Sequence, residues 1–267
     1  MTDAGDAGDA GETSADADAA AGRRVRADGG APATQRTVGI LGGMSYHSTL
    51  DYYREVNAGV NDSLGGHHSA DLLVSSVDFG PVEALMREGD FDALGERLAA
   101  RARGLEAGGA EAVLLATNTM HRVAPAIEAA LSVPFVHIVD VTAEAVREAG
   151  HERVGLLGTR FTMGESFARD RFAENGVEVV VPDAADRELV DDVVFDELVH
   201  GVVREESRAA YRRVVADLLD RGAEGVVFGC TEIGMLLDRA DVDAPVFDTT
   251  ERHVARAVDL CLGRVDP

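Results

Sequence analysis

Two stretches of equal length decide the fold, Ala110-Glu-Ala-Val-Leu-Leu-Ala-Thr-Asn-Thr119 and Ala223-Glu-Gly-Val-Val-Phe-Gly-Cys-Thr-Glu232. They align without gaps. Each runs from Ala-Glu into an apolar segment and stops at a hydroxyl- or thiol-bearing residue that polar residues follow. Thr117 and Cys230 therefore occupy equivalent positions of a duplicated unit.

The duplication extends beyond this pair. Val38-Gly-Ile-Leu-Gly-Gly matches Val154-Gly-Leu-Leu-Gly-Thr, 116 residues later, and Thr117 precedes Cys230 by 113 residues. Val133-Pro-Phe-Val also matches the later Ala244-Pro-Val-Phe. Three ordered matches at a nearly constant offset indicate two similar lobes.

Short apolar runs alternate with segments whose apolar residues recur every three or four positions. This alternation is typical of parallel sheets covered by helices on both faces. The predicted strands are 38–41, 71–77, 112–116, 135–138, 153–157, 177–181, 225–228 and 246–247. The predicted helices include 48–64, 91–107, 207–221 and 250–262.

The fold class is therefore α/β, with two similar Rossmann-like lobes related by pseudo-two-fold symmetry and a cleft between them. We expect a first lobe at 36–140, completed by a C-terminal helix within 245–267, and a second lobe at 141–244. Residues 1–35 are mostly Ala, Gly, Asp and Thr, a composition that predicts a disordered acidic tail.

The formal net charge is −23, and all 25 basic residues are arginine. A surface this acidic repels nucleic acid and anionic lipid, and it resembles the surfaces of proteins from salt-loving organisms. No apolar run is long enough to span a membrane, and no apolar signal segment opens the chain, so we expect a cytoplasmic protein. The two cysteines form no metal-binding spacing, so no metal site is predicted.

In open parallel sheets the ligand lies beyond the carboxyl ends of the strands. Those ends gather Gly42–Ser45, Thr117–Thr119, Thr159 and Cys230–Glu232 around one cleft. The Gly-Gly-Met-Ser turn at 42–45 lacks the Gly-x-Gly-x-x-Gly pattern, which disfavours a dinucleotide. It is either a simple tight turn or a seat for a small carboxylate at a helix N-terminus.

Cys230 is the strongest site candidate, because it ends a predicted strand, and a helix N-terminus there can lower its pKa. Cys261 lies on an apolar helical stripe and is expected to be structural. The short polar side chains at 117–119 can bind a carboxylate or simply cap a helix. Arg160 and Arg187 are candidate carboxylate clamps, or else exposed ion-paired residues.

These motifs resemble the aspartate/glutamate racemase family of cofactor-independent amino-acid racemases. The resemblance covers the chain from about Thr37 onward and is carried by Gly-Ile-Leu-Gly-Gly-Met-Ser at 39–45, Thr-Asn-Thr-Met-His at 117–121, Leu-Gly-Thr at 157–159 and Gly-Cys-Thr-Glu at 229–232. It implies a homodimer with an active site between two lobes and neither a cofactor nor a metal. It also implies an acidic amino acid as substrate, with one cysteine per lobe exchanging the α-proton.

The sequence departs from this pattern at Thr117, which stands where the first-lobe cysteine would be. The departure resembles a subgroup that pairs a threonine with a cysteine, so we expect Cys230 to abstract the proton and Thr117 to pass one. Racemisation is then expected to be slow or unequal for the two enantiomers. The expected substrate-binding residues are Met44, Asn118, Thr119, Thr159, Arg187, Thr231 and Glu232.

Two alternatives stay open at this point. One is a single-cysteine decarboxylase or isomerase of a small dicarboxylate. The other is a binding protein that has kept the cleft and lost one catalytic arm.

Overall fold

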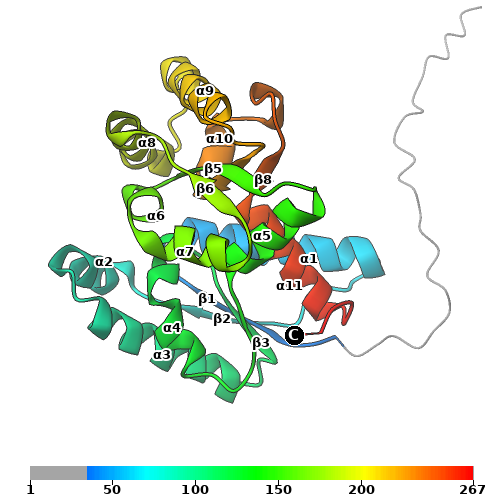
Figure 1. Cartoon of the computed structure of the whole chain (residues 1–267). Coiled ribbons are helices and arrows are strands. Elements are labelled where there is room, and N and C mark those ends of the chain that lie inside the picture. The colour runs from blue at the N-terminus through cyan, green and yellow to red at the C-terminus, as the bar shows by residue number, and fades with distance from the viewer. Residues whose placement is uncertain (1–34, 267) are drawn as a thin grey trace, which may run out of the picture. The chain divides into compact units, whose positions relative to one another are not determined.

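A computed structural model describes residues 35–266. The tail expected at 1–35 lies outside the described residues except for Gln35. Two four-stranded sheets, both parallel, organise the described part of the chain (Figure 1). The first contains β1 (Val38–Gly42), β2 (Leu72–Ser76), β3 (Ala112–Leu115) and β4 (Phe135–Val136), in the order β2-β1-β3-β4. The second contains β5 (Arg153–Gly158), β6 (Glu178–Val180), β7 (Val226–Gly229) and β8 (Val246–Asp248), in the order β6-β5-β7-β8.

The two sheets thus have the same strand order, which confirms the two-lobed α/β fold expected from the sequence repeat. We call the elements around the first sheet the first lobe and those around the second sheet the second lobe. Strands β1 and β3 are buried throughout because every side chain they carry is apolar or absent. The second sheet extends past residue 244, where the second lobe was expected to end, because β8 pairs with β7.

Helices connect the strands, and many begin at a short polar side chain that caps the first turn. Ser45, Asp78 and Thr159 each accept a hydrogen bond from a backbone N–H of the helix that they precede. The first-lobe helices are α1 (Tyr46–Leu64), α2 (Phe79–Glu88), α3 (Phe91–Ala107), the 3-10 helix η1 (Thr119–Val123) and α4 (Ala124–Glu128). The remaining helices are α5 (Ile138–Glu148), α6 (Arg160–Gly164), α7 (Ser166–Glu174), α8 (Ala184–Asp196), η2 (Leu198–His200), α9 (Glu205–Asp220), α10 (Ile233–Leu236), η3 (Arg239–Asp241) and α11 (Thr249–Cys261).

One predicted strand runs into the start of the helix that follows it. The run Phe135–Ile138 was expected to be extended, but β4 ends at Val136 and α5 begins at Ile138. The physical reason is His137, whose ring nitrogen accepts a hydrogen bond from the Val139 N–H and caps the helix. The apolar residues after it belong to the buried face of α5, which an apolar run alone does not distinguish from a strand.

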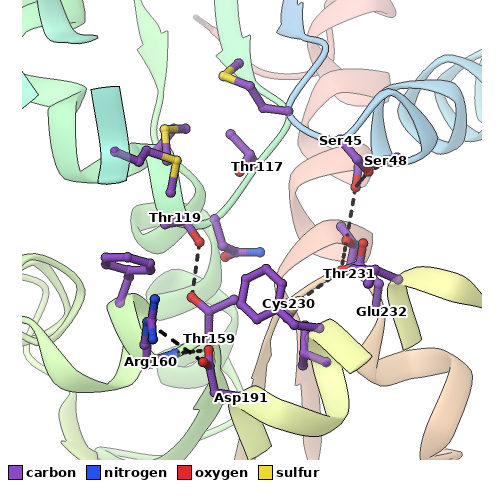
Figure 2. Close-up of a pocket in the computed structure, with 18 of the residues that line it drawn as sticks. Ser45, Ser48, Thr117, Thr119, Thr159, Arg160, Asp191, Cys230, Thr231 and Glu232 are labelled. Carbon is purple, nitrogen blue, oxygen red and sulfur yellow. Dashed lines mark hydrogen bonds and ion pairs between the residues drawn. The ribbon is translucent and has the colours of Figure 1, made fainter. Parts of the chain in front are cut away.

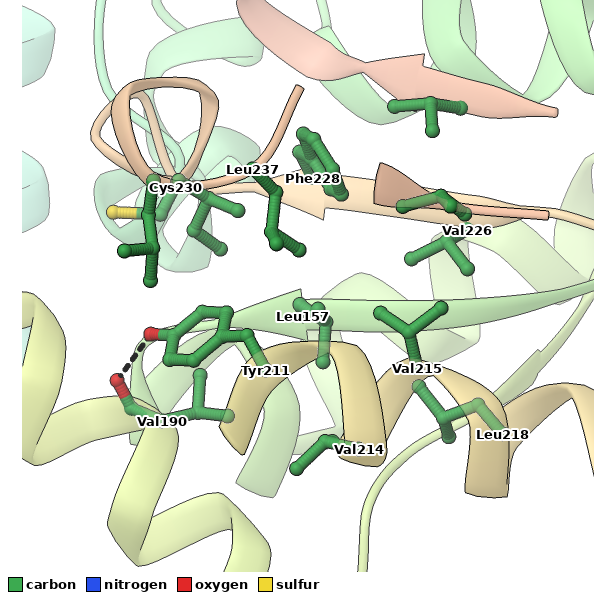
Figure 3. Close-up of a cluster of buried hydrophobic side chains, with 14 of the residues drawn as sticks. Leu157, Val190, Tyr211, Val214, Val215, Leu218, Val226, Phe228, Cys230 and Leu237 are labelled. Atoms are coloured by element: carbon green, nitrogen blue, oxygen red, sulfur yellow. Dashed lines mark hydrogen bonds between the residues drawn. The ribbon is translucent and has the colours of Figure 1, made fainter. Parts of the chain in front are cut away.

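Each lobe has its own apolar core. In the second lobe, Leu157 and Val226 of the sheet pack against Tyr211, Val215 and Leu218 of α9 (Figure 3). The Tyr211 hydroxyl donates to the Val190 carbonyl at 2.8 Å, so its polar atom is satisfied within the core. Cys230 lies at the edge of this cluster (Figure 3).

Helix α11 follows β8 of the second sheet but packs against α1 and α5, beside the first sheet (Figure 1). Its apolar residues Val254, Ala257 and Val258 share a core cluster with Val38 and Tyr52. The Tyr52 hydroxyl also hydrogen-bonds to Nδ1 of His253 at 2.8 Å. Within residues 35–266, no helix has the length and apolar character needed to cross a membrane.

Candidate active site

A cavity of about 790 Å³ is lined by residues of both lobes, at the carboxyl ends of the strands. Figure 2 shows the hydroxyl, thiol and carboxyl groups that face it. Eight of the nine residues expected at the site line it, namely Met44, Thr117, Asn118, Thr119, Thr159, Cys230, Thr231 and Glu232. Arg187 does not line it and lies on α8.

The turn after β1 brings one wall of the cavity into place. Gly43 has φ +93°, and a Cβ atom there would lie 2.3 Å from the backbone N and O of Val77. Only glycine accommodates both the positive φ and this close approach. The Thr49 hydroxyl accepts a hydrogen bond from Gly43 N–H at 2.8 Å, and the turn then presents Met44 and Ser45 to the cavity.

Thr117 follows β3, and a hydrogen bond to its backbone carbonyl holds it in place. Its carbonyl lies 2.7 Å from Nδ1 of His121, while Nε2 of the same ring accepts from the Ile138 N–H at 3.2 Å. Because Nε2 is an acceptor, Nδ1 carries the proton and donates to the Thr117 carbonyl. Burial lowers the pKa of His121 well below its ordinary value, so the ring is neutral. His121 thus orients Thr117 and contributes no charge.

Cys230 directly follows β7. Its Sγ donates to Oε2 of Glu232 at 2.9 Å, and the Thr231 hydroxyl donates to the same oxygen at 2.5 Å. The Thr231 hydroxyl also lies 3.1 Å from the Ser48 hydroxyl, so the second-lobe cluster touches the start of α1 (Figure 2).

The expectation that a helix N-terminus lowers the pKa of Cys230 is wrong. Burial raises the pKa of this thiol well above its ordinary value, and the negative charge of Glu232 raises it further. The helix that follows, α10, is only one turn long. The backbone N–H of Glu232 at its start lowers the pKa of Cys230, but burial and the Glu232 carboxylate have larger effects in the opposite direction. Cys230 is therefore a neutral thiol at neutral pH that donates its proton to a carboxylate.

Two further contacts join the lobes beside the cavity. The Thr119 and Thr159 hydroxyls are 3.2 Å apart (Figure 2). Asn118 Nδ2 donates to the Thr249 hydroxyl at 3.0 Å, and that hydroxyl donates to the Phe228 carbonyl at 2.9 Å. These hydrogen bonds fix the Thr117 loop relative to β7, which Cys230 follows.

Arginines that line the cavity already have carboxylate partners. Arg160 donates its backbone N–H to Asp191 Oδ1 at 2.7 Å, and its Nε lies 3.9 Å from the other oxygen of Asp191. Arg87 is ion-paired with Glu83. Among residues 35–266, no three potential metal ligands lie together. Of the two arginines that the sequence offered as carboxylate ligands, Arg160 lines the cavity and Arg187 does not.

Several lining residues were not expected from the sequence. They are the α2 and α8 residues and their neighbours, Phe79, Glu83, Met86, Arg87, Phe161, Asp191, Asp192, Val194, Phe195 and Val199. No motif marks them, because they reach the cavity through the packing of two helices rather than from strand ends. The periodicity of 184–196 could have located α8, but not which of its faces lines the cleft.

Fold and site together define a two-lobed α/β protein whose duplicated strand ends meet at one polar cavity. The sequence profile of the Asp/Glu/Hydantoin racemase family matches residues 41–257, and the chain belongs to this family. A Yersinia pestis protein assigned as an Asp/Glu racemase has a similar structure, with a TM-score of 0.82 and 45% sequence identity over 85% of this chain and 99% of that one.

Two more relatives extend the comparison. An aspartate racemase homologue from Pyrococcus horikoshii OT3 has a TM-score of 0.74 and 31% identity, over 85% of this chain and 99% of that one. The broad specificity amino-acid racemase RacX of Bacillus subtilis strain 168 is 24% identical over 220 residues, which are 80% of this chain and 92% of the relative. Family and relatives together support an isomerase of the amino-acid racemase type.

Proposed function

We propose that this protein is a cofactor-independent amino-acid racemase that exchanges the α-proton of aspartate, glutamate or a similar amino acid between Cys230 and Thr117. One observation carries the proposal: two residues at equivalent positions of the duplicated unit line one cavity from different lobes. A stereocentre bound between them presents one face to the sulfur and the other to the hydroxyl.

The Cys230–Glu232 hydrogen bond supplies the base in this scheme. When the thiol proton moves to Glu232, the thiolate takes the α-proton of the substrate. The Thr117 hydroxyl then delivers a proton to the opposite face and takes a replacement from solvent. Glu232 releases the thiol proton to solvent, so that all three side chains return to their starting states. A threonine is a much poorer base than a thiolate, so the two directions are expected to differ in rate.

Hydroxyl and amide groups provide for the α-carboxylate. Asn118, Thr119 and Thr159 line the cavity and carry donors, whereas the Thr231 hydroxyl already donates to Glu232. Several such hydrogen bonds stabilise the negative charge that develops when the α-proton leaves, and partial exclusion of water strengthens them. Arg160 is the cation at the cavity wall that can add charge, in competition with Asp191.

The test is α-proton exchange in heavy water, followed by NMR, with L- and D-aspartate and L- and D-glutamate. The wild type should exchange at least one enantiomer, and Cys230→Ser should exchange none. Cys261→Ala is the matched control, because Cys261 is buried in the first-lobe core and does not line the cavity. Unchanged exchange in Cys230→Ser would refute the proposal, and binding without exchange would favour a binding protein.

A second candidate follows from the raised pKa of Cys230, because a neutral thiol is a proton donor. A single-cysteine decarboxylase or isomerase of a small dicarboxylate would need such a donor to protonate an enolate. Release of carbon dioxide from substituted malonates, or isomerisation of maleate, would support this candidate if amino acids show no exchange.

A further inference from the structure

The cavity changes in character between its inner and outer parts. The groups at the inner part are polar and buried, with Cys230 8% exposed and Thr159 7% exposed. Large apolar side chains also line the cavity, and they are open to solvent: Phe195 is 47% exposed, while Phe79 and Val199 are each 38% exposed. The exposed ones therefore stand at the mouth.

This apolar mouth is contributed by both lobes. The exposed Phe79 belongs to α2, whereas the exposed Phe195 and Val199 belong to α8 and η2. The half-buried side chains of Met86 in α2 and Phe161 in α6 also line the cavity. Exposed apolar side chains that gather on both sides of one cavity mark a surface that a ligand covers. A small-molecule site with apolar walls and a few converging polar groups has this composition.

The charges at the cavity wall do not favour a second carboxylate on the ligand. Besides Glu232, the lining contains Glu83, Asp191 and Asp192 but only two arginines, Arg87 and Arg160. Each of these arginines is already ion-paired, Arg87 with Glu83 and Arg160 with Asp191. The side-chain carboxylate of aspartate or glutamate would meet surplus negative charge here, whereas an apolar side chain would not.

The volume of the cavity also favours a ligand larger than aspartate. At about 790 Å³ the cavity is in the range of sites that enclose drug-sized ligands, roughly 300–1,000 Å³. An aspartate held at Cys230 and Thr117 would leave the mouth and its phenylalanines uncovered.

From these observations the geometry points to a subsite at the mouth, lined by Phe79, Phe161 and Phe195, that takes a large apolar substituent of the substrate. The substrates of the racemase then include amino acids with large apolar side chains, such as phenylalanine, methionine and leucine. This assignment rests on the proposed function, since it places the α-carbon between Cys230 and Thr117.

The experiment measures α-proton exchange in heavy water for both enantiomers of phenylalanine, methionine, leucine and aspartate. Wild type should exchange at least one apolar amino acid with a kcat/KM no lower than that for aspartate. In Phe79→Ser and Phe195→Ser, the ratio of kcat/KM for phenylalanine to that for aspartate should fall about tenfold or more. Tyr53→Ser is the matched control, because Tyr53 is 52% exposed on α1 and does not line the cavity.

Calorimetric titration of phenylalanine and aspartate into the same four proteins gives a readout that does not depend on turnover. Exchange or inhibition by aspartate alone, with no binding of phenylalanine, would overturn the subsite and leave the proposed function intact. Phenylalanine binding that neither substitution weakens would also overturn it. If no amino acid exchanges, the proposed function fails, and weaker phenylalanine binding in Phe195→Ser still supports the subsite.

Discussion

Glu232 accepts two hydrogen bonds on one carboxylate oxygen, from the Cys230 thiol and the Thr231 hydroxyl. This arrangement has opposite effects on two properties of the sulfur. The negative charge of Glu232 keeps the proton on sulfur and raises the pKa of Cys230. The same carboxylate is also an acceptor for that proton. A single substitution can separate these effects.

In Glu232→Gln, we expect the pKa of Cys230 to fall, because the Glu232 charge that raises it is removed, while burial and the smaller effect of Asp191 still raise it. Alkylation of Cys230 by iodoacetamide should then begin at lower pH, while α-proton exchange falls about a hundredfold or more because the proton acceptor is lost. Peptide mass spectrometry separates Cys230 from Cys261. Glu83→Gln, which removes a carboxylate at another wall of the cavity, should leave the alkylation profile unchanged.

Thr117→Cys tests the duplicated pair directly. A thiol ionises far more readily than a hydroxyl, so a thiolate can form at this position and accept the α-proton. Exchange of the slower enantiomer should therefore rise by about tenfold or more. Exchange rates of L- and D-aspartate in heavy water measure this. Thr119→Cys places the same thiol two residues further along the cavity wall and should bring no such gain; equal gains in both variants would argue against a specific role for position 117.

The sequence predicted that these strand-end residues face one cavity, because the repeat by itself relates Thr117 to Cys230. It predicted the pKa of Cys230 wrongly, because burial and a neighbouring carboxylate are three-dimensional properties. The apolar mouth could not be predicted either, since Phe79 and Phe195 are far apart in sequence and carry no motif.

Among the elements, the turn between β1 and α1 makes the strictest demand on the sequence. Gly43 combines φ +93° with contact to the backbone of Val77, which continues the chain beyond β2. Gly89, which follows α2, has φ +73° and ψ +15°, in the left-handed helical region, but no neighbouring group lies within 4 Å of the point that a Cβ would occupy there. Alanine substitutions at the two glycines therefore separate the free-energy cost of the positive φ from the cost of steric overlap.

Gly43→Ala should lower the free energy of unfolding by about 3 kcal/mol or more, because strain and steric overlap add. Gly89→Ala should cost about 1 kcal/mol, from the left-handed conformation alone. Urea unfolding followed by circular dichroism measures both. Equal losses in the two variants would show that the contact with Val77 relaxes without cost.

The eight strands found among residues 35–266 were all located from short apolar runs, and the helices 91–107 and 250–262 were placed within a residue of α3 and α11. These elements have strong periodicity and clear boundaries. Helices such as α2 and α8 were not singled out, because their apolar residues face both a core and the open cavity. The strand β4 was overextended because His137 ends it through a side-chain cap.

Across the whole molecule, three buried histidines join elements distant in sequence. His121 of η1, His137 before α5 and His253 of α11 lie together, with ring centroids 4.5 Å apart for His121 and His137 and 6.0 Å for His121 and His253. Burial lowers the pKa of His137 to about 3 and that of His253 to about 4. All three rings are neutral in the folded protein near pH 7.

Acid should therefore destabilise the fold. An unfolded histidine takes up a proton near pH 6.5, while the folded His137 stays neutral down to about pH 3, so the unfolded state binds more protons between these values. Stability present above pH 6.5 is lost as pH falls, by up to about 1.4 kcal/mol per pH unit for each such group.

His137→Asn tests this, since asparagine keeps the cap on α5 but does not titrate. Urea unfolding at pH 7, 6 and 5 should show that the free energy of unfolding falls less steeply with decreasing pH in the variant. The difference in slope should correspond to about one proton fewer taken up on unfolding. Parallel curves for the two proteins would contradict the assignment of a depressed pKa to His137.

The course of α11 has a consequence for synthesis on the ribosome. Residues 249–261 are translated after both sheets, yet Val254, Ala257 and Val258 close the core around Val38 and Tyr52. During translation, the first lobe therefore keeps part of its apolar core exposed until this helix emerges from the exit tunnel. The two lobes therefore cannot complete their cores one after the other during translation, because a helix at the end of the chain completes the core of the first lobe.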